Sequence, residues 1–548
     1  GELHIFGDTS PNRPLWGPPG EYPEDSPTAA YAAWHFSSAA QAYANRLIAD
    51  PAPQPSLLAY ALLGDATRDL PPTNAPSRIY KSGGAFFREA TSNTDGLSSG
   101  MLNLTAAEGH THKETNSISL IGHGENLITN SGYAGYDAGT LGYGWDYINN
   151  RAISGNTVLI NYPVTDPKAA SATNDHARKY GAGIVRGLIT EGLDYAVGDT
   201  GTALPAGVHQ RGMAFVHPDA VAGTPGYWFL LDRVTSATGS TAHLALHPFS
   251  ANVATVTANR SYRWFVKRDT TDGTYLSIHL ASPPSQTQML DGVFANLDPT
   301  KTFIGKFLYP TYPIQSGTAH FATAILPHKV ATETPVITPL TGGGFKGMSL
   351  GWGTTTDTFL SADPNTGALT SGATSWNGTG CYVRMVNGTL TRFLADRATA
   401  FSHGNVTFNS TSPCLVIGEG TQLSFQLDTA ATVQCRWPGV TAAYPDHSNA
   451  PLVPGGNGVF SVALPAGTHV IHFGSPSKPV QEMRRQGETM ILGVKGLHPG
   501  KAYQHETSTD LLNWTPLKTG IANSPTDIIA APGDTAARFF RIVLPENP

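Results

Sequence analysis

The chain has 548 residues, a formal net charge of −6 and only 14% charged residues. Its 34 lysines and arginines form no long run, which argues against a nucleic-acid-binding protein, because such a protein needs a basic stripe to displace counterions. The same observation weakens the case for binding to a membrane surface. With 40% hydrophobic residues the chain is not disordered, and its length predicts two to four domains.

The composition also bears on location and redox state. The 59 glycines and 41 prolines, with abundant Thr, Ser and Asn, are typical of an extracellular protein rich in turns, so we expect a secreted or periplasmic location. No run of about 18 apolar residues occurs, so no transmembrane helix is expected. No signal peptide is visible at Gly1, and we expect a mature or truncated product, or one chain of a cleaved protein. Cys381, Cys414 and Cys435 permit one disulfide and leave an odd thiol.

A helical segment is predicted near the start of the chain. Ser26 and Pro27 suit an N-cap and a first helical turn, and apolar residues then recur with helical spacing as far as residue 49. A second short helix is predicted over residues 56–63. Two helices cannot bury both of their faces, so this segment needs the rest of the chain, or further helices, as a partner.

From about Ile79 the sequence pattern changes to short β-segments separated by Gly, Asn and Asp turns. Many such segments without helices between them indicate stacked antiparallel sheets. The fold class is therefore mainly β, with large antiparallel β-sandwich domains preceded by a short helical segment. The clearest strands are expected at residues 117–121, 157–160, 212–216, 227–232, 262–266, 459–464 and 469–473.

Two changes in composition suggest domain boundaries. One lies at residues 330–340, where Thr-Glu-Thr-Pro precedes a Gly-rich stretch, and another near residues 476–479. The expected domains are 1–75, 76–335, 336–478 and 479–548. The last resembles a small C-terminal β-module of secreted bacterial proteins, with an accessory or surface-retention role.

The segment that carries chemistry is Gly-His-Thr-His at residues 109–112. In an extended backbone, residues two apart point to the same side, so His110 and His112 present both imidazoles to one face. Such a pair can bind a metal, or divide into a catalytic imidazole and a ligand. It is also compatible with two structural histidines.

The surroundings of this pair resemble the β-domain of the heparinase II/III-like polysaccharide lyases. The Gly-His-x-His motif is followed by Asn-Ser at residues 116–117, a strand, and Ser-Gly-Tyr at residues 131–133. Ser154–Asn161 is similar to an Asn-Thr-Val strand of that family, and Val208–Arg211 with the strand ending at Arg233 is similar to its next His-Arg hairpin. The resemblance covers residues 1–330 and implies that residues 1–75 are the end of a helical toroid.

This resemblance implies depolymerisation of a uronic-acid-containing polysaccharide by β-elimination. The reaction requires neutralisation of the uronate carboxylate, a base for the C5 proton and an acid for the departing O4. The family places a catalytic or substrate-positioning histidine at His110. Tyr133 and Tyr136 lie close enough in sequence to approach the substrate, and the guanidinium of Arg88 suits a uronate or sulfate group.

A zinc site is a further implication. Some family members have zinc ligands that correspond to His112, Asn130 and His209. Asparagine stands where a carboxylate is expected and is a poor ligand for zinc. The alternative is a hydrogen-bonded structural cluster that supports the cleft.

Most of the family's toroid has no counterpart in this sequence. We therefore expect a separate N-terminal helical chain or fragment as a partner, and an acidic polysaccharide as the substrate of a polysaccharide lyase. Two alternatives stay open: a C5-uronate epimerase, which removes the same proton, and a non-catalytic protein that binds acidic glycans.

Overall fold

A computed structural model describes most of the chain beyond residue 76. The helices expected at residues 26–49 and 56–63 lie outside the described part, as do His110, Tyr133 and Tyr136. The described residues are 77–89, 96–106, 112–132, 142–169, 173–258, 260–266, 273–295, 302–330, 335–363, 367–446, 451–474, 480–486, 489–495, 502–508, 513–521, 526–532 and 539–543.

The described structure is mainly β, as the sequence predicts. All seven of the clearest predicted strands are present, with ends that differ by a few residues. Helical structure within the described residues is limited to one α-helix and short 3₁₀ turns: α4 (Trp145–Asn150), η2 (Ala152–Ser154), η3 (Pro167–Ala169) and η6 (Gly456–Gly458). In this described part, no helix has the length and apolarity needed to cross a membrane.

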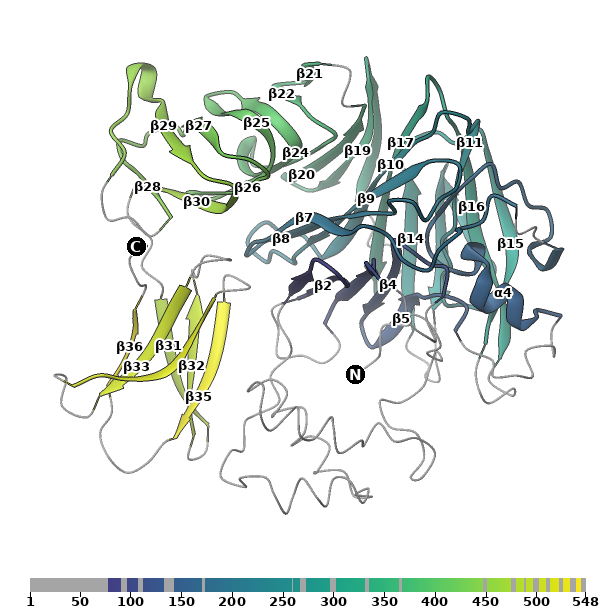
Figure 1. Ribbon diagram of the computed structural model, residues 1–548, viewed down its shortest axis with the longest axis horizontal. Helices are drawn as coiled ribbons and strands as arrows, with labels where there is room; N and C mark the ends of the chain where they lie inside the picture. Colours follow the sequence, from purple (N-terminus) through teal and green to yellow (C-terminus); the bar gives the residue numbers. More distant parts are fainter. Residues whose placement is uncertain are drawn as a thin grey trace.

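An eight-stranded antiparallel sheet forms the centre of the structure (Figure 1). Its strand order is β12-β13-β14-β17-β10-β9-β8-β7. These strands are β7 (Gly183–Ile189), β8 (Leu193–Asp199), β9 (Val208–Val216), β10 (Tyr227–Thr235), β12 (Thr255–Ala258), β13 (Ser261–Val266), β14 (Thr274–Leu280) and β17 (Thr318–His328).

Two smaller sheets cover one face of the central sheet, and their shared hydrophobic core includes Phe87, Leu120, Trp228 and Leu308. The five-stranded sheet has the order β1-β2-β3-β4-β5 and the four-stranded sheet the order β15-β16-β11-β6. Their strands are β1 (Arg78–Tyr80), β2 (Gly84–Arg88), β3 (Ser98–Leu102), β4 (Ser117–Gly122), β5 (Glu125–Ile128), β6 (Val158–Ile160), β11 (Thr241–Leu244), β15 (Gln286–Phe294) and β16 (Phe303–Pro313).

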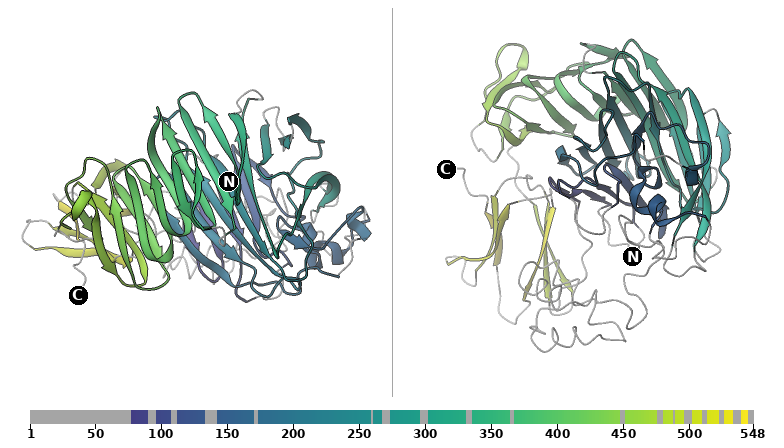
Figure 2. Two further views of the ribbon diagram at one scale, coloured as in Figure 1. Left: turned by 90° about the horizontal axis from the view of Figure 1, so that it is seen from above. Right: turned by 45° about the vertical axis from the view of Figure 1, so that its right-hand side comes forward.

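A thirteen-stranded sheet covers the other face of the central sheet, so the central sheet lies between two layers (Figure 2). The long strands β24 and β25 change partners along their length, and the sheet curls around a core of its own. The strands are β18 (Val336–Gly342), β19 (Phe345–Trp352), β20 (Thr355–Ala362), β21 (Leu369–Ser371), β22 (Thr374–Asn377), β23 (Gly380–Val386), β24 (Thr389–His403), β25 (Val406–Glu419), β26 (Gln422–Leu427), β27 (Ala431–Arg436), β28 (Ala443–Pro445), β29 (Phe460–Leu464) and β30 (Gly467–Phe473).

Strand β10 shows why the sequence of the central sheet is so apolar. Tyr227 and Phe229 pack toward the thirteen-stranded sheet, while Trp228 and Leu230 pack toward the smaller sheets. Successive residues of a strand point to opposite faces, so a strand that is covered on both faces is apolar at almost every position.

The C-terminal module consists of two three-stranded sheets, ordered β31-β32-β35 and β34-β33-β36. Its strands are β31 (Val480–Gln486), β32 (Thr489–Lys495), β33 (Ala502–Ser508), β34 (Thr515–Ile521), β35 (Thr526–Pro532) and β36 (Phe539–Val543).

The three cysteines are all free and buried, so the disulfide that their number permits is not formed. Burial raises the pKa of Cys414 and of Cys435 to about 12. These thiols therefore stay protonated near neutral pH and act as small apolar core residues.

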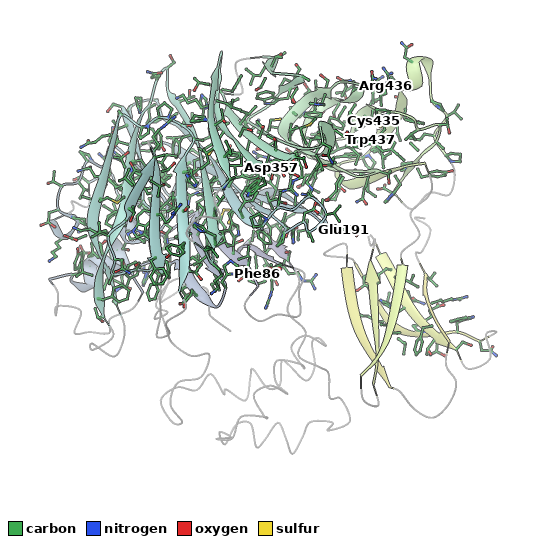
Figure 3. The ribbon with its side chains drawn as sticks, turned by 180° about the vertical axis from the view of Figure 1, so that it is seen from behind. Phe86, Glu191, Asp357, Cys435, Arg436 and Trp437 are labelled. Carbon is green, nitrogen blue, oxygen red and sulfur yellow. The ribbon has the colours of Figure 1, made fainter. Side chains whose placement is uncertain are left out.

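A buried carboxylate joins the central sheet to the thirteen-stranded sheet. Asp357, labelled in Figure 3 near the junction of the two sheets, accepts hydrogen bonds from the hydroxyl of Tyr227 at 2.8 Å and of Tyr382 at 3.0 Å. The Arg384 guanidinium binds the same carboxylate through Nε at 2.8 Å and a terminal nitrogen at 2.7 Å. The segments expected as separate domains, 76–335 and 336–478, thus share a continuous buried interface.

We predict that Asp357→Ala lowers the free energy of unfolding by about 3–5 kcal/mol, because it removes the buried counter-charge of Arg384 and the acceptor of the Tyr227 and Tyr382 hydroxyls. Urea denaturation would measure this loss. Asp219→Asn is the matched control, since Asp219 is 28% exposed and lies 3.4 Å from the same guanidinium. Its expected cost is below about 1 kcal/mol, and equal costs for the two variants would contradict the prediction.

Buried histidines make the stability of the fold sensitive to acid. Burial lowers the pKa of His176 and His243 to about 4, and of His247 and His279 to about 3. An unfolded chain has imidazole pKa values of about 6.5, so it binds more protons than the folded protein below that pH. The contribution of these neutral histidines to the free energy of unfolding is therefore fully present above about pH 6.5. It decreases as the pH falls toward the pKa values of the folded protein.

We predict that the melting temperature is lower at pH 5 than at pH 7 by roughly 10 °C. Differential scanning calorimetry would measure the shift. The variant His279→Asn keeps a polar atom near Ser261, whose Oγ lies 2.8 Å from Nδ1 of His279, but does not titrate in this range. The melting temperature of this variant should fall less between pH 7 and pH 5 than that of the wild type. Equal melting temperatures of the wild type at both pH values would refute the explanation.

Candidate active site

The described part of the histidine motif is the loop from His112 to Asn116, which leads directly into β4. His112 and Glu114 are buried, whereas Lys113 between them is half-buried. The loop lies on the same face of the central sheet as the two smaller sheets, and side chains from several strands contact it.

Asn116 fixes the end of this loop. Its φ of 62° lies in the left-handed region, which asparagine tolerates better than most residues. Its Nδ2 donates to the carbonyl oxygens of His209 at 3.1 Å and Gly198 at 3.2 Å, and its Oδ1 accepts from Nδ2 of Asn103 at 2.5 Å. The side chain thus ties the loop to both β8 and β9.

Gly198 on β8 makes this close approach possible. A Cβ atom at this position would lie 2.2 Å from Oδ1 of Asn116 and 3.0 Å from Nδ2 of Asn103. No side chain larger than hydrogen fits there without displacing the amide groups.

Arg211 on β9 is fully buried, and its guanidinium group donates hydrogen bonds to the loop. One terminal nitrogen donates to the carbonyl oxygens of Asn116 at 2.9 Å and Asn156 at 2.5 Å, and Nε donates to Asp232 at 2.7 Å. Burial opposes ionisation of Asp232, but the Arg211 charge outweighs it, so the pKa of Asp232 is lowered. The pair therefore stays ionised and holds the loops that precede β4 and β6.

His209 belongs to the same cluster. Its Nε2 lies 2.7 Å from Asp232, and its Nδ1 lies 3.4 Å from Nδ2 of Asn116. Burial lowers the pKa of His209 despite the nearby Asp232 carboxylate. The imidazole is therefore neutral and donates its Nε2 proton to Asp232. We call Asn103, Asn116, Asn156, His209, Arg211 and Asp232 the buried polar network.

Asn130 and Glu114 form a second attachment of the motif loop. Nδ2 of Asn130 donates to Glu114 at 2.6 Å, and Oδ1 of Asn130 accepts from the backbone N–H of Gly132 at 3.0 Å. The hydroxyl of Thr157 also donates to the carbonyl oxygen of Thr115 at 2.6 Å. The loop is thus held on both sides by hydrogen bonds to neighbouring segments.

A buried carboxyl group lies in the segment that follows β6. Burial raises the pKa of Asp175 to about 6, although the backbone N–H groups of Ala152 at 2.9 Å and His176 at 2.7 Å donate to it. The pKa of Tyr162 is also raised, mainly by burial and to a smaller extent by the charge of Asp175. A carboxyl group that titrates near neutrality beside a tyrosine is a pairing suited to proton transfer.

Two of the three predicted zinc ligands, His209 and Asn130, do not fit zinc in this arrangement. Both ring nitrogens of His209 face protein groups, and both polar atoms of Asn130 are engaged in hydrogen bonds. Throughout the described residues, no group of three or more His, Cys, Asp or Glu side chains could hold a metal ion. The contacts of His209 and Asn130 match the alternative of a hydrogen-bonded structural cluster.

Arg88 lies away from the motif loop. The register aligns Arg88 with Ser98 and Ile121, whereas the loop enters the sheet at Ser117, which pairs with Leu102. Four residues along a strand correspond to about 13 Å. The five-stranded sheet therefore carries Arg88 and the motif loop at opposite ends.

Sequence patterns alone did not single out Asn116, Asn156, Arg211 or Asp232 as members of one network. A usable signal was present in β10, where Asp232 interrupts an otherwise apolar run. A charge inside a strand that is buried on both faces requires a buried partner. The sequence does not reveal which residue supplies that partner.

No family model matches the sequence, and no curated protein matches it. Among solved structures, the heparan sulfate lyase HepC from Pedobacter heparinus is similar, with a TM-score of 0.44 and 14% identity over 64% of this chain and 48% of that chain. A heparinase III gene product has a TM-score of 0.44 and 12% identity over 70% of this chain and 50% of that chain. This chain thus spans about half the length of these structures.

We predict that Asn116→Ala lowers the free energy of unfolding by about 3 kcal/mol or more, because it removes three buried hydrogen bonds and places a Cβ-bearing residue without local support at positive φ. Asn116→Gly removes the same hydrogen bonds but tolerates the backbone conformation, so it should cost about 1 kcal/mol less. Chemical denaturation would compare the two variants. Equal stability of Asn116→Ala and the wild type would show that the network does not hold the loop.

Proposed function

We propose that this chain is the C-terminal part of a polysaccharide lyase that cleaves a uronate-containing glycan by β-elimination. The observation that carries the proposal is the motif loop: its order of residues resembles the heparinase II/III-like pattern, and its described part is held by the buried polar network. Burying several polar groups is favourable only when all are hydrogen-bonded, and such networks hold functional segments in a defined geometry.

In this proposal His110 takes part in proton transfer or positions the uronate, and Tyr133 and Tyr136 approach the sugar from the same loop region. Asp175 and Tyr162 form a buried pair that supports proton transfer near neutral pH. Arg88, at the other end of the five-stranded sheet, contributes to glycan binding away from the cleaved bond. A separate N-terminal helical chain or fragment completes the cleft, and the protein acts in a secreted or periplasmic location.

The test is an ultraviolet absorbance assay on a panel of acidic polysaccharides, because β-elimination creates a conjugated double bond. We expect His110→Ala to lower kcat/KM by about 10²–10⁴-fold, the usual contribution of a proton-transfer group. His123→Asn is the matched control, since His123 lies in the β4–β5 turn with a φ of 55° that asparagine tolerates. Its activity should equal that of the wild type.

Deuterium exchange and a binding measurement, combined with this assay, distinguish the alternatives. An epimerase would incorporate solvent deuterium at C5 without a rise in absorbance. A non-catalytic glycan-binding protein would bind the polymer equally well after His110→Ala and show no turnover in the presence of the helical partner. Either result would replace the lyase proposal.

A further inference from the structure

The apolar layer between the central sheet and the thirteen-stranded sheet ends in a group of cationic side chains. Leu231 pairs with Ala322 across β10 and β17, and both belong to the apolar layer. The next pair on the same face is Arg233 with His320. Arg233 and His320 therefore face the thirteen-stranded sheet at the end of the apolar layer.

The thirteen-stranded sheet places further cations at this end. Lys346 is two residues from Met348 on β19, so it shares the face that packs on the central sheet. Nδ1 of His320 lies 3.0 Å from the carbonyl oxygen of Ser361, the cross-strand partner of Lys346. The exposed Arg397, with a φ of 51°, lies in the bulge of β24.

The carboxylates nearby are already engaged. Asp396 binds Arg186 across the interface, with a contact of 2.8 Å from a terminal guanidinium nitrogen. Asp363 accepts a hydrogen bond from the hydroxyl of Thr318 at 2.7 Å. Asp363 and Asp396 are near Arg233, together with the cations Arg186 and Arg397, and Lys346 is near His320.

Three of these cations have no ion pair with any described residue: Arg233, Lys346 and Arg397, which we call the rim cluster. Nε of Arg233 is buried, and no residue in the described part of the chain accepts a hydrogen bond from it. Burial lowers the pKa of Arg233, partly offset by Asp363, and the charges of Arg397 and Arg186 lower it further. Burial also lowers the pKa of Lys346. Half-buried like charges destabilise each other until an anion joins them.

We propose that the rim cluster binds an oxyanion, either a free ion or a sulfate or carboxylate group of an acidic glycan. A guanidinium group matches the geometry of such anions, and two further cations at the same end of the interface add charge. Asp232 and Arg233 are adjacent on β10 and point to opposite faces, so this site and the motif loop lie on different sides of the central sheet. The inference therefore does not depend on the proposed lyase activity.

The test is a calorimetric titration of the full chain with sodium sulfate, with ionic strength held constant by sodium chloride. We expect the double variant Lys346→Gln/Arg397→Gln to weaken sulfate binding at least tenfold. Arg436→Gln is the matched control: Arg436, labelled in Figure 3, is a partly exposed arginine on β27 of the same sheet, and its binding should equal that of the wild type. Equal dissociation constants for the double variant and the wild type would overturn the proposal, as would the lack of any sulfate binding by the wild type.

A second pair of measurements controls for folding and identifies the source of the anion. Lys346 and Arg397 are partly or fully exposed, so circular dichroism should show an unchanged fold for the double variant, and Lys346→Arg should retain binding. Titration with a sulfated glycosaminoglycan tetrasaccharide and its desulfated form then separates the sources. If the tetrasaccharide binds to the wild type and not to the double variant, the anion is a group of a glycan. If sulfate binds but the tetrasaccharide does not, the anion is a free oxyanion.

Discussion

The ion pair between Arg211 and Asp232 is the constraint on which the candidate active site depends. Both residues are fully buried on adjacent strands of a sheet that is covered on both faces. A buried guanidinium must find an acceptor for each N–H group, and the carboxylate alone does not satisfy them all. The carbonyl oxygens of Asn116 and Asn156 accept from the terminal nitrogen that does not bind Asp232. The loops that precede β4 and β6 are thereby held over the central sheet, and the first of them carries the histidine motif.

The double coverage of the central sheet has a second consequence. The thirteen-stranded sheet packs on the face opposite the motif, and its apolar residues share one hydrophobic core with those of the central sheet. Inside this interface, Asp357 binds Tyr382 and Arg384 of its own sheet and Tyr227 of the central sheet. At its end, apolar residues are replaced by Arg233 and Lys346, which form no ion pair with any residue that the structure describes.

The proposed reaction depends on the loop that carries the histidine motif. β-Elimination needs proton-transfer groups held at fixed positions against the substrate. His110 is attached to a segment whose next residues are hydrogen-bonded to several strands, and Asp175 titrates near neutrality in a neighbouring segment. His209, in contrast, supports this loop as a neutral, fully hydrogen-bonded imidazole, a role that differs from the metal ligand expected from the family pattern.

The sequence by itself determined the mainly β class, the strands and the position of the histidine motif, because these follow from local alternation, turn residues and residue order. The sequence also shows Asp232 within an otherwise apolar run, and the structure shows that this strand is covered on both faces, so that the charge needs a buried partner. Only the tertiary structure decided that the partner is Arg211, that His209 is engaged on both nitrogens, and that Arg88 lies at the far end of its sheet from the motif. These outcomes depend on strand register and on contacts between sheets, which join residues far apart in the chain and leave no periodic signal in the sequence.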